Sequence, residues 1–114
     1  MEAWKYLGIP YEELDCWNLV RKIYSEEFGI LLPERDEAVD RTEWSLISLG
    51  EERVGDLLVF RAAGSGFHTH VGVVVDGSPP RMLHTEPLVN SCLGRYTSPL
   101  WKQRLKNIHR HKGL

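Results

Sequence analysis

One cysteine and two histidines have the side-chain types and positions that covalent catalysis needs. Cys16 follows Asp15 at the start of a segment whose apolar residues recur at helical spacing. The Asp15 carboxylate is suited to cap this helix, because it can accept hydrogen bonds from the free amides of the first turn. A thiol in that turn meets partial positive charge, which favours the nucleophilic thiolate. Cys16 is therefore a candidate nucleophile, although a buried structural cysteine fits the same pattern.

The histidines His70 and His84 lie in two segments that we expect to be neighbouring strands. Side chains alternate along a strand, so His70 points away from the face formed by the valines of the run 69–75. Asp76-Gly77 is a hairpin signal, and His70 and His84 each lie seven positions from Gly77. Antiparallel pairing would bring both imidazoles to the same end of the hairpin. Cys16 would then attack, His70 would take its proton, and His84 would hold the His70 ring in one tautomer.

A metal site is the main chemical alternative for these histidines. His68 and His70 are two positions apart and share a strand face, so they could bind a metal together with His84 or Cys16, in a metal-dependent hydrolase or a metal-binding protein. No paired-cysteine or helical paired-histidine signature accompanies them. We therefore predict neither a metal nor another cofactor.

The remaining cysteine and histidines are interpreted without a chemical role. Cys92 has no base in its local sequence and is read as a packing or incidental residue. His109 and His111 are read as solvated residues of the tail.

The elements that must position the site divide into a helical half and a strand half. We expect a short helix ending at Gly8, a main helix from Asp15 to the stop at Gly29, and a second helix over Thr42–Leu49. Apolar and β-branched runs predict strands at 56–61, 69–75, 81–85, 88–93 and 105–110. Helices followed by an antiparallel meander indicate an α+β fold, in one domain over residues 1–114.

Composition and charge exclude several classes of protein. The net charge is −2, from 14 basic and 16 acidic side chains, so the chain has no broad basic surface for nucleic acid. No apolar run approaches the ~20 residues of a membrane span. The first residues lack the basic and apolar regions of a signal peptide, so we expect synthesis in the cytoplasm.

A series of short motifs resembles the NlpC-type (NlpC/p-sixty) peptidases, papain-like cysteine peptidases that cut cell-wall peptides. In chain order the motifs are Pro10-Tyr11, Asp15-Cys16, Gly55-Asp56-Leu57-Leu58-Val59-Phe60, His70-Val71-Gly72-Val73 and Met82-Leu83-His84. Three segments are similar to the phage-tail-associated branch of that family: Asp15-Cys16-Trp17, residues 29–33 after the main helix, and residues 96–101.

The resemblance implies a papain-like fold, with N-terminal helices packed on an antiparallel sheet. It implies Cys16 as the nucleophile, His70 as the general base and His84 as the polar third member. It also implies that the Tyr11 hydroxyl helps to stabilise the oxyanion. Trp17, beside the nucleophile, is a candidate for lining the substrate cleft.

The implied substrate is an amide bond of the peptidoglycan stem. The implied partners are phage tail proteins, with action at the cell wall as part of a virion or after release. Two positions depart from the family pattern: Trp17 stands where serine is common, and Asn18 where glycine is usual. The alternative to a peptidase is therefore a module that keeps the fold without catalysis and serves tail assembly or glycan binding.

Overall fold

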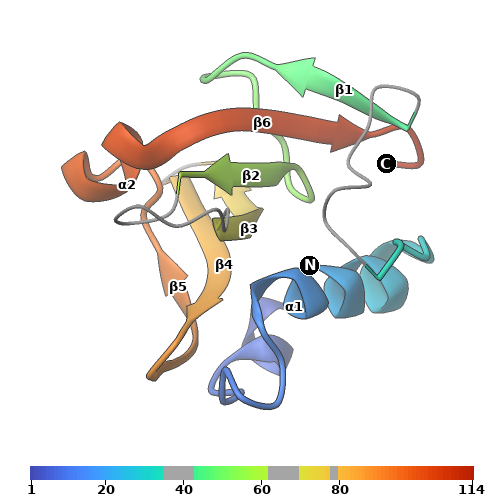
Figure 1. Cartoon of the computed structure of the whole chain (residues 1–114). Coiled ribbons are helices and arrows are strands. Elements are labelled where there is room, and N and C mark those ends of the chain that lie inside the picture. Colours follow the sequence, from blue (N-terminus) through green and yellow to red (C-terminus); the bar gives the residue numbers. More distant parts are fainter. Residues whose placement is uncertain (35–42, 62–69, 78–79) are drawn as a thin grey trace.

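An antiparallel sheet of six strands forms the centre of the computed structural model, which describes residues 1–34, 43–61, 70–77 and 80–114. The strands are β1 (Trp44–Ile47), β2 (Leu57–Phe60), β3 (His70–Gly77), β4 (Pro80–Glu86), β5 (Val89–Gly94) and β6 (Leu105–His111). Their order across the sheet is β1-β6-β2-β3-β4-β5, so β6 inserts between β1 and β2 (Figure 1). The strands from β2 to β5 form the predicted meander.

The helical segments are η1 (Ala3–Tyr6), α1 (Cys16–Ile23), η2 (Tyr24–Phe28) and α2 (Pro99–Arg104). The segments α1 and η2 together form the expected main helix. An Asp15 carboxylate oxygen accepts the Asn18 N–H at 2.9 Å, which confirms the predicted cap. The helix ends at Gly29, whose φ of 67° is readily adopted by a residue without a Cβ atom.

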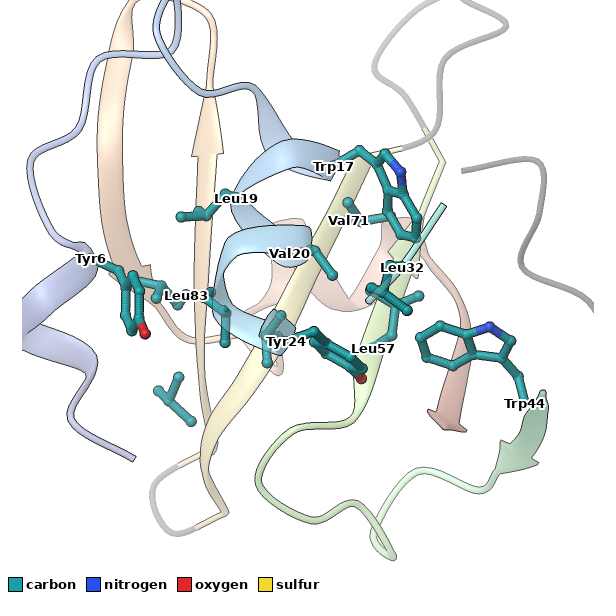
Figure 2. Close-up of a cluster of buried hydrophobic side chains, with 13 residues drawn as sticks. Tyr6, Trp17, Leu19, Val20, Tyr24, Leu32, Trp44, Leu57, Val71 and Leu83 are labelled. Carbon is teal, nitrogen blue, oxygen red and sulfur yellow. The ribbon is translucent and has the colours of Figure 1, made fainter. Parts of the chain in front are cut away.

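The helix α1 lies over one face of the sheet and forms the main core with it (Figure 1). Figure 2 shows side chains of this helix pointing toward Leu57, Val71 and Leu83 of the strands. The valines that were expected to share a face, at positions 71, 73 and 75, all lie in this cluster. Removing each such side chain from water stabilises the fold by about 1.5–3 kcal/mol. The α+β fold with helices packed on an antiparallel sheet is thereby confirmed.

The opposite face of the sheet is also buried. Its cluster contains Leu58, Phe60, Val74, Met82, Tyr96 and Ile108, with Trp101 of α2 packed against them. The apolar run of β2 is continuous because its side chains are buried in cores on both faces of the sheet. The histidine face of β3 is therefore an interior face as well.

The second helix predicted over Thr42–Leu49 is wrong. Trp44–Ile47 forms the edge strand β1, which pairs antiparallel with β6. Burial of the Trp44 side chain against the core and pairing with β6 outweigh the weak helical tendency of so short a segment. Thr42 itself lies outside the described residues.

Two further predictions concern connections between the strands. The register pairs Asp76 with Arg81 and Gly77 with Pro80, so Asp76-Gly77 belongs to β3 and not to the turn. His68 and the turn predicted at residues 63–66 lie outside the described residues. None of the helices described here has the length and apolar character needed to cross a membrane.

Candidate active site

The two histidines meet as predicted, inside the second core. Nε2 of His70 and Nδ1 of His84 are 3.0 Å apart and share a hydrogen bond. The side chains are almost fully enclosed, with exposed fractions of 9% for His70 and 5% for His84. Gly72 lies against β4 at this point, because a Cβ atom at that position would lie 3.0 Å from the Met82 sulfur and 3.4 Å from the Cβ atom of His84. The pairing of β3 with β4 thus fixes both rings from the backbone outward.

Aromatic side chains form the walls of this site. Trp101 stacks on His70 with ring centres 5.1 Å apart, and meets His84 nearly perpendicular to it at 4.9 Å. Phe60 contacts His70, with ring centres 5.7 Å apart. The Arg104 guanidinium lies over the Trp101 ring, 4.7 Å from its centre. These contacts restrict the orientation of both imidazoles.

Enclosure keeps both imidazoles neutral. Burial, followed by the electrostatic effects of His84 and Arg104, lowers the pKa of His70 to about 3. Burial also lowers the pKa of His84 to about 4, with a second contribution from Arg104. A neutral imidazole has one ring nitrogen that can accept a proton. His70 is therefore in the protonation state that a general base requires.

Cys16 is not among the groups gathered around the imidazole pair. His70, His84 and Glu86 have ligand atoms within 4.8 Å of one another, and the Cys16 thiol does not belong to that group. Cys16 is half-buried at the start of α1 and packs against the main core cluster. The structure thus brings together the predicted base and third member, but does not place the predicted nucleophile against them.

Tyr11 lies close enough to Cys16 to feel its charge. Burial raises the pKa of the Tyr11 hydroxyl, and the charges of Cys16 and Asp15 raise it further. The amides of Glu13 and Leu14 both donate to the Pro10 carbonyl, which folds this short loop onto the helix start.

Asn18 is held within the cap of α1. Its side-chain amide donates to the Asp15 carboxylate at 3.0 Å, and its side-chain oxygen accepts from Arg21 at 2.9 Å. Asn18, one of the two residues that depart from the family pattern, is thereby fixed against its own helix.

Trp17 lies in the core and not in a cleft. Its side chain is 6% exposed, and the indole N–H donates to the Pro33 carbonyl at 3.0 Å. Figure 2 shows the ring packed beside Val71.

Sequence reasoning missed the contact of Cys92 with the histidine pair. Its Sγ atom lies 3.7 Å from Nε2 of His84, because β4 and β5 pair with these residues directly opposite. A base on the neighbouring strand cannot be recognised from the local sequence, so this contact could be predicted only from the register of the two strands.

Trp101 and Glu86 also escaped the sequence analysis, and the interpretation of two tail histidines was wrong. The rings of His109 and His111 contact Trp44, with ring centres 6.4 and 4.9 Å apart, so they are packed at the edge of the sheet and are not fully solvated.

Comparisons with known proteins agree with this architecture. The model of the NlpC/P60 family matches residues 2–110. A protein named murein DD-endopeptidase MepS/murein LD-carboxypeptidase, from Escherichia coli K12, is 28% identical over 103 residues. The match covers 90% of this chain and 52% of that protein, so the chain spans about half the length of such relatives. Proteins of the same name from strains O6:H1 and O157:H7 match equally.

A solved structure shows the same fold. A crystal structure from Staphylococcus aureus, described as similar to a lipoprotein of the NLP/P60 family, superimposes with a TM-score of 0.75 at 28% identity. The superposition covers 96% of this chain and 39% of that one.

Proposed function

Because the chain belongs to the NlpC/P60 family, we propose that it is a cysteine peptidase that hydrolyses amide bonds in peptidoglycan stem peptides. The observation that carries the proposal is the hydrogen bond between the enclosed rings of His70 and His84. A neutral imidazole whose orientation is fixed by a second group can take a proton from a thiol. The E. coli relatives support the substrate class, since their name states that they cleave murein.

The proposed chemistry assigns one step to each member of the triad. The Cys16 thiol loses its proton to Nδ1 of His70, the ring nitrogen that is not bonded to His84, and the sulfur attacks the carbonyl carbon of the amide. His70 then gives the proton to the departing amine, which leaves a thioester on Cys16. Water, activated by His70, hydrolyses the thioester and restores the thiol. Tyr11 supports this assignment because its hydroxyl lies near the attacking sulfur.

The reaction requires Cys16 and His70 to approach each other when substrate binds. Catalytic hydrogen bonds are often long in the resting enzyme and tighten only in the complex. The competing thiol is Cys92, which already contacts His84. Burial raises the pKa of Cys92, with a second contribution from the charge of Glu86, and this disfavours its thiolate. Cys16 stands at a helix start, where a thiolate is favoured.

We extend the proposal to the place of action. The residues Asp15-Cys16-Trp17 and the segment 96–101 support a phage-tail-associated enzyme. Such an enzyme would be made in the cytoplasm and would act at the cell wall, as part of a virion or after release, with tail proteins as partners.

Digestion of purified peptidoglycan tests the enzymatic proposal, with the released fragments identified by mass spectrometry. We expect the wild-type chain to release new stem-peptide fragments and Cys16→Ala to release none, since it lacks the atom that forms the thioester. Cys92→Ser is the matched thiol control and should keep activity within a few-fold. Release of fragments by Cys16→Ala would overturn the mechanism.

The same assay separates the alternative functions. A fold-keeping module would release no fragments but would still bind intact peptidoglycan, and its Cys16 would react with a thiol reagent as slowly as free cysteine. A metal-dependent hydrolase would lose its activity to a chelator. We expect rapid labelling of Cys16 at neutral pH and no effect of the chelator.

A further inference from the structure

We propose that Cys92 is a positioning residue that holds His84 in the tautomer required for His70 to act as a base. In this arrangement Nε2–H of His84 donates to the Cys92 sulfur, and Nδ1 of His84 accepts Nε2–H of His70. The inference deepens the proposed function and rests on it for its catalytic consequence, whereas the tautomer itself is a property of the resting protein.

Strand β5 reaches the outer edge of the His84 ring at two points. Cys92 lies directly opposite His84 in the register, and its Sγ atom is 3.7 Å from Nε2. A Cβ atom on Gly94 would lie 2.9 Å from the same Nε2 atom, so only glycine at this position leaves the ring where it is. The other ring nitrogen of His84 faces His70. The ring is thus held between a sulfur on one side and an imidazole on the other.

The chain of contacts permits only two proton arrangements between neutral rings. If Nε2 of His84 carries the proton, Nδ1 of His84 accepts from His70, and Nδ1 of His70 is free to take the proton of a nucleophile. If Nδ1 of His84 carries it, the order reverses, and the Nδ1 atom of His70 is already protonated. Each neutral imidazole has one donor and one acceptor, so the partner of His84 at Nε2 decides between them.

The surroundings of Cys92 favour the first arrangement. Glu86 lies close to the imidazole pair, and its negative charge acts on the Cys92 thiol. A carboxylate near the thiol keeps it protonated and attracts its S–H group, which leaves a sulfur lone pair for Nε2–H of His84. Sulfur is a weak acceptor, but in this enclosed site even one hydrogen bond can select a tautomer.

The test combines the imidazole nitrogen spectrum with kinetics on the full chain. Long-range proton–nitrogen correlation of 15N-labelled protein reports which nitrogen of each histidine is protonated. In the wild type we expect the Nε2–H form for both His84 and His70. Cys92→Ala should shift His84 toward the Nδ1–H form and lower kcat about two- to tenfold with KM unchanged, in keeping with the loss of one hydrogen bond.

Two control variants separate positioning from packing. Cys92→Ser keeps an acceptor and should restore most of the tautomer population and of kcat. Asn90→Ala removes an exposed side chain from the same strand and should change neither. The inference is overturned if the wild-type His84 carries its proton on Nδ1, or if Cys92→Ala has the spectrum and kcat of Asn90→Ala.

Failure of this inference is distinguishable from failure of the proposed function. Loss of all turnover in both Cys92→Ser and Cys92→Ala, with turnover retained in Cys16→Ala, would make Cys92 the nucleophile and refute both. Turnover retained in Cys16→Ala with the expected spectra would refute the proposed mechanism and leave the positioning of His84 by Cys92 intact.

Discussion

At the scale of single residues, the site depends on a base that is oriented by a second neutral ring. A carboxylate in the third position would stabilise the imidazolium form of His70 by charge, whereas His84 can do so only through a hydrogen bond. Trp101, stacked on His70, adds a mechanical restraint to that bond. The identity of the acceptor atom at position 84 should therefore matter more than its charge.

Substitution of the two histidines tests this view. His70→Ala should remove nearly all activity, since general-base transfer alone contributes about 10²–10⁴-fold. His84→Ala should cost less, and His84→Gln should recover part of that loss because an amide oxygen can still accept Nε2–H of His70. The measurement is kcat/KM on a stem-peptide substrate. Equal rates for His84→Gln and His84→Ala would contradict the orienting role.

The residues of the site differ in how far the sequence alone could identify them. The meeting of His70 with His84 was predictable because both lie toward the same end of two adjacent antiparallel strands, although the register that pairs Val73 with Leu83 is not centred on Gly77 as the sequence suggested. The contact of Cys92 with His84 was not, because it depends on the register of β5, which no short motif specifies. The sequence could not decide whether Trp17 is buried, because a tryptophan beside a nucleophile can face either a core or a cleft.

At the scale of elements, the inserted strand β6 is bound to β2 by a buried ion pair as well as by the sheet. Asp56, just before β2, is fully buried and accepts from Nε of Arg110 at 2.9 Å and from a terminal guanidinium nitrogen at 2.8 Å. Its carboxylate also accepts the backbone N–H of Arg53 at 2.8 Å. This pair explains the acidic residue of the Gly55-Asp56-Leu57 motif as a structural feature.

Removing that carboxylate should loosen the sheet. Asp56→Ala removes the acceptor of the Arg53 amide and the buried charge that pairs with Arg110, which keeps its bond to the Glu51 carbonyl, so we expect a loss of about 3–5 kcal/mol in the free energy of unfolding. Glu51→Ala is a suitable control, because Arg110 donates to the backbone carbonyl of that residue, whereas the Glu51 carboxylate acts on Arg110 only through its charge. Urea unfolding followed by circular dichroism measures both variants. A loss below 1 kcal/mol for Asp56→Ala would show that the pair contributes little.

The elements were predictable where pattern and packing agree. The main helix has a cap, an apolar stripe and a glycine stop, and the valine run of β3 has one face for the helix. The segment Trp44–Ile47 is too short to show whether its apolar residues follow a helical or a strand repeat. It forms a strand because it pairs with β6, which lies more than fifty residues further along the chain. Pairings of that range have no local signature.

At the scale of the whole molecule, the sheet separates two cores with different tasks. One core joins α1 to the valine face of β3, and the other encloses two titratable rings among Phe60, Met82 and Trp101. The imidazoles stay neutral in the folded chain but can be protonated in the unfolded chain. The stability of the second core therefore depends on pH. The enclosure that provides a neutral base should therefore make the fold sensitive to mild acid.

The sign and the pH range of this sensitivity follow from the lowered pKa values. In the unfolded chain each histidine titrates near its ordinary value of about 6.5, whereas the folded values are about 3 for His70 and about 4 for His84. Between these limits the unfolded state binds more protons, so stability is fully present above pH 6.5 and decreases as the pH falls. From pH 7 to pH 5 we expect a loss of about 2 kcal/mol for each histidine in the free energy of unfolding.

Urea unfolding at pH 7 and pH 5 measures this loss, with the double variant His70→Gln/His84→Gln as the control that should show a much smaller difference. A free energy of unfolding that is the same at pH 7 and pH 5 in the wild-type chain would mean that the imidazoles are solvated, and that the second core is not closed around them.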